Sequence, residues 1–504
     1  MGEVMKRLLI WSIKAFVFFG IVAMTVLLAW AFQSRTMPAL RIWHTASLSE
    51  EFTAREAAPQ SSLKDYLDRE ARLFTELREK VYDQIKPTED LVFCRYRKGG
   101  PQDPEWPERN WNRTFELVPK TIRGGALLLH GLTDSPYSLR RIGEILYSRG
   151  FYVLGLRLPG HGTIPAALTT VHWEDWVAAS RIAARHVRER IGADRPFVIA
   201  GYSNGGGLAV KYCLDALWDP SLPSSDRLLL FSPEIGIEPL AVISNSHYLL
   251  SFLPFFAKFK WLSIEPEYDP FKYNSFPKNA SQQAYELTAS LQRQIKKARK
   301  EGRFADFPPV LTFLSWIDAT VKNSATIQRF YNQLENQDSE LVIFDVNRID
   351  RLTMFIPEAD EEPLQQLVRR SDLPYRLTVI DNFSKESESL AERTKAPNSS
   401  STDASALHLS WPRGVYSLSH VAVPFPPDDP VYGAFESNDS TYHGLPLGRL
   451  QPRGETRFLT LSLSQLMRLR TNPFFGYVER RIAAWSDDLL DHNGRCHFSL
   501  AGLL

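Results

Sequence analysis

The sequence predicts an α/β protein built on a doubly wound, mainly parallel sheet. From about residue 115, short apolar runs rich in β-forming residues alternate with segments that have helical spacing. Runs such as GALLLHGL, PFVIAGYS and PVLTFLSWID have no polar face, as expected for strands that helices cover on both sides. Such alternation produces a parallel sheet between two helical layers, and ligands bind at the carboxyl ends of its strands.

Changes in this pattern divide the 504-residue chain into five segments. We expect an N-terminal membrane anchor at 1–34, a juxtamembrane helical segment at 35–114 and the α/β core at 115–350. A polar, partly disordered insertion at 351–415 follows. The C-terminal segment, 416–504, contains a closing helix.

The N-terminal region contains an uncharged apolar run, AFVFFGIVAMTVLLAWAF, long enough to cross most of a bilayer as a helix. The alternative is a signal peptide cleaved at AWA, but the run exceeds the usual apolar region of such peptides. We therefore expect a retained single-pass anchor. Slightly more basic residues precede the run than follow it, which indicates a cytoplasmic N-terminus and a main domain on the periplasmic or external side.

The juxtamembrane segment contains SSLKDYLDREARLFTELREKVYDQIKP, whose apolar residues recur at helical spacing. We expect an amphipathic helix that packs on the domain or forms a stalk, and that Pro87 ends. Its apolar stripe consists of Leu63, Leu67, Phe74, Leu77, Val81 and Ile85.

Two segments interrupt the α/β alternation. Residues 237–308 combine the aromatic run YLLSFLPFFAKFKWL with a long polar helical pattern, which indicates a cap inserted over the sheet. Residues 384–405 are polar and lack periodicity, which predicts a mobile loop or a disordered insertion.

Composition excludes several classes of function. Lys and Arg number 59 against 58 Asp and Glu, a net charge of +1, so no broad positive field indicates a nucleic-acid partner. The three cysteines are far apart and form no CxxC pair, so neither a disulfide framework nor a cysteine-based zinc site is expected.

The stretch GYSNG, residues 201–205, lies between an apolar strand and a helix. Strand, tight turn and helix are the setting in which G-x-S-x-G forms a nucleophile elbow. Gly201 and Gly205 avoid a Cβ where strand and helix approach, and the turn holds Ser203 in a strained backbone conformation. We predict that Ser203 is a nucleophile. The following glycines do not form a phosphate-binding loop, because G-x-x-x-x-G-K-[ST] is absent.

A nucleophilic serine that attacks a carbonyl needs hydrogen-bond donors for the oxyanion. The residue after the nucleophile, Asn204, offers its backbone N–H, and Leu132 in LLLHGLTDSP offers a second one. His130 precedes the elbow at a strand end, so we expect it to fix this loop and not to act as the base.

The motifs HGLTDSP, LRLPGHGT and GYSNGG, in this order and spacing, resemble the α/β-hydrolase superfamily. The resemblance is closest to serine esterases and monoacylglycerol-lipase-like enzymes, which carry a cap before the strand that bears the acid. It covers about Ala126 to Val346 and a histidine motif near 420. It implies the α/β-hydrolase fold, a structural role for His161, and a triad in the order serine, acid, histidine. The chemistry is implied more firmly than the substrate.

The acid is expected after the strand that follows the cap. PVLTFLSWIDATV places Asp318 at the end of that strand, and we assign it as the acid. A helix-capping role is the structural alternative for this residue. The rival acids are Glu234 in FSPEIGIEP, after the preceding strand, and Asp345, which we expect inside the last recognisable strand.

The histidine is separated from the acid by an unusually long insertion, because no histidine occurs between Asp318 and His408. His420 follows a β-like run and precedes a proline-rich turn, a rigid setting that suits an oriented imidazole. We assign His420 as the base, with His443 in STYHGLPLG as the alternative.

These residues predict a membrane-anchored serine hydrolase that cleaves small-molecule or lipid esters, with apolar acyl groups preferred. No metal or organic cofactor is required by this chemistry. A peptidase, amidase or thioesterase on the same triad is one alternative. A hydrolase-like fold that serves as a non-catalytic receptor or scaffold is the alternative from another class.

Overall fold

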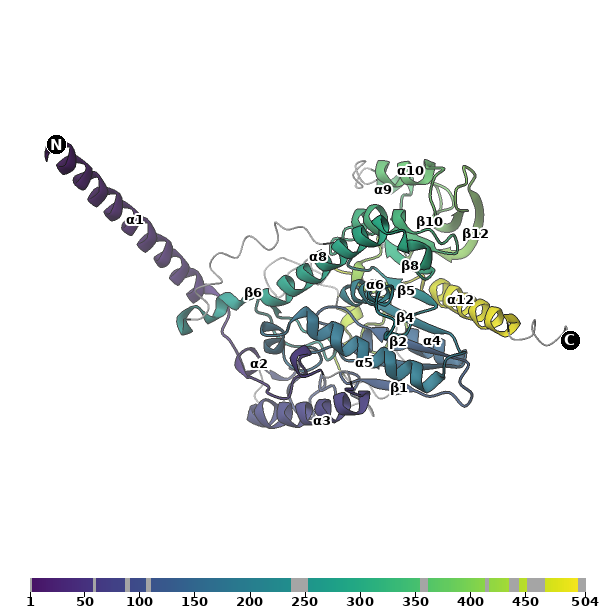
Figure 1. Ribbon diagram of the computed structural model, residues 1–504, viewed down its shortest axis with the longest axis horizontal. Coiled ribbons are helices and arrows are strands. Elements are labelled where there is room, and N and C mark those ends of the chain that lie inside the picture. Colours follow the sequence, from purple (N-terminus) through teal and green to yellow (C-terminus); the bar gives the residue numbers. More distant parts are fainter. Residues whose placement is uncertain are drawn as a thin grey trace.

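The computed structural model describes residues 2–57, 60–86, 91–105, 110–236, 253–353, 361–412, 417–434, 444–450 and 467–496. Its centre is a ten-stranded sheet in the order β1-β3-β2-β4-β5-β8-β9-β10-β11-β12 (Figure 1). The strands are β1 (Phe115–Leu117), β2 (Gly124–Leu129), β3 (Phe151–Leu156), β4 (Phe197–Tyr202), β5 (Arg227–Phe231), β8 (Val310–Ser315), β9 (Glu340–Phe344), β10 (Arg376–Asn382), β11 (Ser389–Lys395) and β12 (Asp403–Ser410).

The sheet is parallel from β3 to β10 and antiparallel only at its two edges. β1 pairs antiparallel with β3, and β11 pairs antiparallel with both β10 and β12. The interior strands pair in parallel, as in the registers Leu127 to Ile199 and Leu230 to Thr312. This arrangement confirms the predicted mainly parallel, doubly wound sheet.

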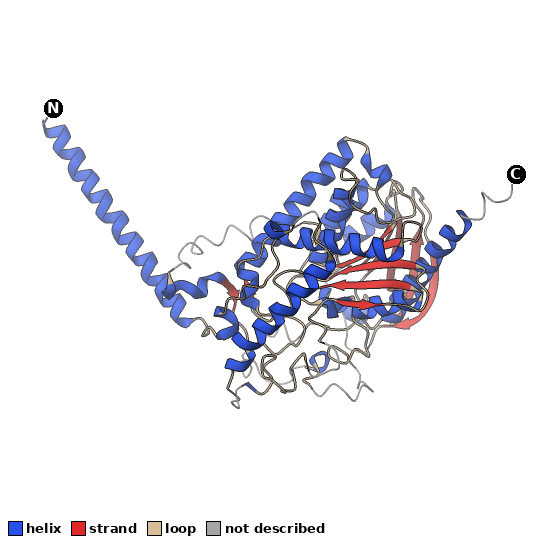
Figure 2. Cartoon of the chain, turned by 60° about the horizontal axis from the view of Figure 1, so that its bottom comes forward, coloured by secondary structure: helices blue, strands red, loops and turns tan. Residues whose placement is uncertain are grey.

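Helices cover both faces of the sheet, as Figure 2 shows. On one face lie α5 (Trp173–Ile191) and α6 (Asn204–Ala216), and on the other lie α4 (Arg140–Ser148) and α12 (Phe475–Cys496). Neighbouring residues of β4 point to opposite faces: Ile199 joins the core under α5, and Val198 joins the core under α4. Because β4 is buried on both faces, its sequence has no polar alternation.

The juxtamembrane helix packs on the domain and does not form a stalk. It is α3 (Leu63–Lys80), which starts at the N-cap Ser62 with Asp65 completing a capping box. Short helix α2 (Ile42–Thr45) precedes it. Glu70 of α3 is buried and ion-pairs with Arg157 of the core at 3.0 Å, which ties the segment to the end of β3.

The N-terminal helix α1 (Gly2–Thr36) extends away from the domain (Figure 1). Among the described residues, Glu3–Thr36 is the helix long and apolar enough to cross a membrane. An anchor and a signal sequence both have these properties, so retention of the helix and the side occupied by the domain stay predictions.

The segment that we predict to be a cap lies between β5 and β8. Its described part contains a small antiparallel pair, β6 (Trp261–Ser263) and β7 (Phe276–Pro277), and the long helix α8 (Lys278–Lys300). Helix α8 packs on α6, the helix that follows Ser203. Residues 237–252, which include the start of the predicted aromatic run, lie outside the described residues.

The prediction that residues 384–405 form a mobile loop or a disordered insertion is wrong, because strand β11 and the start of strand β12 lie in this segment. The sheet continues past β9 through β10, β11 and β12, with α9 (Asp350–Thr353) and α10 (Glu362–Arg369) before them. Strand β12 lies at the open edge and is mostly exposed, so its sequence lacks a buried face that periodicity could reveal. Backbone pairing and ion pairs such as Arg393 with Asp381, at 2.7 Å, hold these polar strands.

Candidate active site

Ser203 lies in a strained turn between β4 and α6, as predicted. Its φ is +54°, in the region that disfavours residues with a Cβ. A Cβ on Gly201 would lie 2.5 Å from the Gly205 carbonyl oxygen, and one on Gly205 would lie 2.1 Å from the Leu129 carbonyl oxygen. The strand and helix can therefore approach this closely only with glycine at both positions.

The loop after β2 runs beside Ser203. A Cβ on Gly131 would lie 3.2 Å from the Ser203 Cβ, and Thr133 has a φ of +64°. The backbone N–H of Leu132 donates no hydrogen bond to another backbone group in the part of the chain that the structure describes. Asn204 is the first residue of α6, where the N–H has no acceptor within the helix. Both amides are thus available to a ligand, and their role as oxyanion donors stays a prediction.

Asp318 and His420 meet although 102 positions separate them in the sequence. The Asp318 Oδ2 lies 2.7 Å from the His420 Nδ1. The other oxygen, Oδ1, accepts hydrogen bonds from the N–H groups of Thr320 and Val321, at 2.8 and 2.9 Å. Burial works to raise the pKa of Asp318, but attraction to His420 and these hydrogen bonds lower it below its ordinary value. Asp318 is therefore held as a carboxylate.

The histidine ring lies beside the elbow. His420 is 4% exposed, and its ring centroid is 5.4 Å from that of Tyr202, the residue before Ser203. The chain reaches this place only after β10, β11 and β12 have extended the sheet. Buried Leu418 and Val423 then fix the short turn that carries the ring.

The ring nitrogens of His130 and His161 contact backbone groups of nearby loops, as expected for residues with a structural role. The His130 Nε2 accepts a hydrogen bond from the Leu158 N–H at 3.0 Å, while Nδ1 lies 2.9 Å from the Gly131 carbonyl oxygen. The His161 Nδ1 lies 3.0 Å from the Pro159 carbonyl oxygen. Burial lowers the pKa of His161 to about 3 and that of His130 well below its ordinary value, so both rings are neutral.

The rival residues have different positions. Asp345 lies one residue past the end of β9, not inside it, and pairs with Arg348 at 2.6 Å. The expectation that Asp345 lies within the strand is therefore wrong. His443 lies outside the described residues. Within the described ranges, no group of three or more His, Cys, Asp or Glu side chains could hold a metal ion.

A cavity of about 330 Å³ lies next to the elbow. It is bounded by the loop after β2, the cap and the loop that bears Asp318. Its walls are formed by Leu132, Glu234, Gly236, Phe276, Ser281, Ala284, Asp318, Ala319, Thr320, Val321 and Lys322. The sequence indicated Glu234 only as a rival acid and did not place it in the same cavity as Asp318.

Glu234 is a second acid in this cavity. Burial first, and then the charge of Asp318, raise the pKa of Glu234 to about 7. Its Oε2 is buried and has no hydrogen-bond partner in the described part of the chain. Near neutral pH the cavity thus contains one carboxylate, Asp318, and one half-protonated acid.

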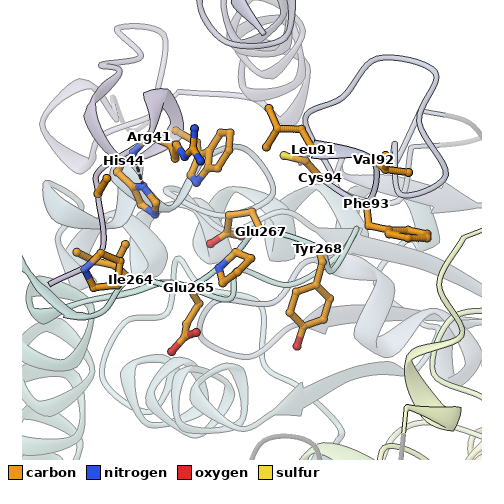
Figure 3. A pocket seen from close by; sticks show the side chains of 14 residues that line it. Arg41, His44, Leu91, Val92, Phe93, Cys94, Ile264, Glu265, Glu267 and Tyr268 are labelled. Carbon is orange, nitrogen blue, oxygen red and sulfur yellow. Dashed lines mark hydrogen bonds between the residues drawn. The ribbon is translucent and has the colours of Figure 1, made fainter. Parts of the chain in front are cut away.

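A larger cavity, of about 490 Å³, lies elsewhere (Figure 3). Arg41 and His44 of the juxtamembrane segment line one side, and residues 91–94 and 264–268 line the others. Ser203, Asp318 and His420 do not contribute to its walls. Ser203 and His420 do not line the smaller cavity either, but Asp318 and Leu132 do, so the smaller cavity is the candidate substrate site.

Residues 120–347 match a family model described as serine aminopeptidase, S33. Over 86 residues the chain is 33% identical to the thermostable monoacylglycerol lipase of Bacillus sp. (strain H-257), a match that covers 17% of this chain and 33% of that lipase. The chain thus matches about a third of the length of this curated relative.

Solved structures of lipolytic enzymes are also similar. The metagenome-derived LipS and LipT structure has 21% identity, with 52% of this chain and 98% of that chain covered and a TM-score of 0.37. The monoacylglycerol lipase of Paleococcus ferrophilus has 17% identity, with 51% and 96% covered and a TM-score of 0.34.

Proposed function

Because this chain belongs to the α/β-hydrolase superfamily, we propose that it is a serine hydrolase that cleaves carboxylic esters through a triad of Ser203, His420 and Asp318. The observation that carries the proposal is the 2.7 Å hydrogen bond between Asp318 and His420, whose ring centroid lies 5.4 Å from that of Tyr202, the residue before a serine held at a φ of +54°. A buried acid that orients a histidine beside a strained serine is the arrangement that acyl transfer requires.

In this mechanism His420 takes the Ser203 proton while the serine oxygen attacks the ester carbonyl. The backbone N–H groups of Leu132 and Asn204 donate hydrogen bonds to the oxyanion. His420 then gives the proton to the leaving alcohol, and the acyl group stays on Ser203. Water, activated by the same histidine, releases the acid and restores the serine.

Asp318 supports this cycle by its charge and its position. As a carboxylate it accepts the His420 Nδ1–H, which leaves Nε2 as the basic nitrogen. It also stabilises the imidazolium that forms when His420 takes the proton. Since two backbone N–H groups fix its second oxygen, the carboxylate keeps its orientation when the imidazole becomes charged.

We infer that the substrate is a lipid ester with an apolar acyl group. One relative of this chain is a monoacylglycerol lipase, which supports this substrate class. The cap residues Leu253 and Phe255, which are exposed, support it as well. Ser34 at the end of α1 donates a hydrogen bond to the Phe255 carbonyl oxygen at 2.8 Å, so a membrane-inserted α1 would hold the cap near the bilayer. The family description makes amide hydrolysis the second candidate.

Ester hydrolysis by the purified full chain tests the proposal. We expect turnover of p-nitrophenyl esters from acetate to palmitate, with longer chains preferred, and loss of turnover in Ser203→Ala. Faster cleavage of a matched p-nitroanilide would favour the amidase. Absence of turnover in folded protein would instead support the receptor or scaffold.

Membrane fractionation, together with protease accessibility of the domain, tests the proposed single-pass anchor and extracytoplasmic location.

A further inference from the structure

The carboxyl group of Glu234 has no function in the mechanism above. Glu234 follows β5 and shares the wall of the 330 Å³ cavity with Asp318. Its Oε2 is buried without a hydrogen-bond partner, and no lysine or arginine in the described residues ion-pairs with it. Buried carboxyl groups nearly always have such a partner. The cavity therefore offers a binding position that no residue in the described part of the chain fills.

Backbone strain marks this position as part of the active site. Three neighbouring strands, β2, β4 and β5, are each followed by a residue other than glycine with positive φ: Thr133 at +64°, Ser203 at +54° and Ser232 at +41°. The first two strained turns carry the proposed oxyanion donors and nucleophile. The third places Glu234, two residues further on. Such strain is costly and is found where the position of a side chain matters for function.

Contacts from two sides fix Glu234 relative to the nucleophile. The Glu234 N–H donates to the Ser203 carbonyl oxygen at 2.9 Å. A Cβ on Gly207 would lie 2.5 Å from the Glu234 carbonyl oxygen, so the loop packs directly on α6. On the cap side, Gln292 of α8 donates to the Ile235 carbonyl oxygen at 2.8 Å. The backbone that carries the carboxyl group is thus held between the elbow and the cap.

The charge that acts on Glu234 is the carboxylate of Asp318, and a second negative charge beside it favours a cationic ligand. Asp318 is ionised and lies on the same wall, with His420 bonded to it. Lys322 contributes to the cavity wall with an exposed side chain, and the Arg329 guanidinium lies 3.2 Å from the position of a Cβ on Gly236. Neither cation lowers the pKa of Glu234, which burial and Asp318 raise to about 7. Above that pH, two carboxylates face one cavity, and a substrate cation would stabilise both.

We propose that Glu234 is a specificity-determining residue that binds an ammonium group of the substrate, so that the enzyme selects esters that carry a positive charge in this cavity. This inference rests on the proposed ester hydrolysis at Ser203. An apolar group on the opposite side of the ester is compatible with it, because only the group inside this cavity contacts Glu234.

Two matched pairs of esters test the inference on the full chain. In the first pair, the charge lies on the acyl side: p-nitrophenyl 6-ammoniohexanoate is compared with p-nitrophenyl heptanoate. In the second, it lies on the alcohol side: 3-(ammoniomethyl)phenyl butyrate is compared with 3-ethylphenyl butyrate. The ratio of kcat/KM within each pair is measured from pH 6 to pH 8.5 for the wild type, Glu234→Gln and Glu286→Gln. Glu286 lies on cap helix α8 but does not line the cavity. Glu286→Gln is therefore the control, because it removes one negative charge from the cap without changing the cavity wall.

For the pair whose charge enters the cavity, we expect the ammonium ester to be preferred at pH 8 by about tenfold or more, because charged hydrogen bonds are the strong ones. The preference should fall toward pH 6, as Glu234 becomes protonated, and disappear in Glu234→Gln but not in Glu286→Gln. A ratio near one in both pairs at every pH would overturn the inference, as would an unchanged preference in Glu234→Gln. Loss of all turnover in folded wild type would instead refute the ester hydrolase itself.

Discussion

Replacing Asp318 by asparagine probes the proposed triad at its best-defined contact. The Asp318 Oδ1 accepts two backbone N–H groups, from Thr320 and Val321. An asparagine at 318 keeps these bonds by placing its oxygen there, which directs its NH₂ group toward the His420 Nδ1. The histidine must then accept at Nδ1 and carry its proton on Nε2. The nitrogen that should take the Ser203 proton is thereby blocked.

The expected loss follows from this exchange of tautomers. In serine hydrolases the equivalent change lowers kcat by about 10⁴, which corresponds to roughly 5 kcal/mol of transition-state stabilisation. The assay is the kcat of p-nitrophenyl butyrate hydrolysis at pH 7.5, with folding checked by thermal melting. Asp345→Asn is the matched control, because Asp345 is also buried after a parallel strand but pairs with Arg348. Turnover of Asp318→Asn within tenfold of wild type, or an equal loss in Asp345→Asn, would refute the assignment.

Three further predictions concern the same site. His420→Ala should lower kcat for p-nitrophenyl butyrate by several orders of magnitude, whereas His443→Ala should stay near wild type; the reverse order would move the base to His443. Gly205→Ala brings a Cβ to 2.1 Å from the Leu129 carbonyl oxygen, so it should cost about 1–3 kcal/mol of unfolding free energy and lower turnover. Gly476→Ala, where the nearest atom is 3.8 Å away, serves as the control, and equal melting temperatures would contradict the close packing. Because folding raises the pKa of Glu234 from 4.5 to about 7, its ionisation destabilises the folded state progressively as the pH rises through this range, by up to about 3 kcal/mol. Glu234→Gln should therefore be more stable than wild type in urea unfolding at pH 8 but not at pH 4, and a pH-independent difference would contradict the shift.

Local sequence was sufficient to predict the sheet and the elbow. β4 is apolar on both faces, and GYSNG follows it at once, so strand, turn and helix could be recognised from adjacent residues. The parallel order follows from the alternation of such strands with helices. The pairing of Asp318 with His420 was also predicted, although it rests on the order implied by the resemblance and not on any local pattern.

The extension of the sheet could not be predicted, for a physical reason. Strands β11 and β12 lie toward an open edge, where backbone pairing and surface ion pairs replace apolar burial. Their polar sequence is indistinguishable from that of a loop. Because these strands were missed, the long path from β9 to His420 had no structural explanation in the sequence.

The role of Glu234 in the cavity was equally hidden from the sequence. Its position depends on a strained turn at Ser232 and on contacts with α6 and α8, elements that are distant from one another along the chain. A glutamate after an apolar strand carries no sign of these contacts. Only the three-dimensional arrangement brings its carboxyl group to the same wall as Asp318.

Covalent labelling tests the central claim most directly. The full chain is treated with a fluorophosphonate probe at pH 7.5, and the modified peptide is identified by mass spectrometry. Our account predicts one adduct, on Ser203, that is absent from Ser203→Ala and strongly slowed in His420→Ala. Folded wild-type protein that remains unlabelled, or that carries its adduct on a different serine, would contradict it.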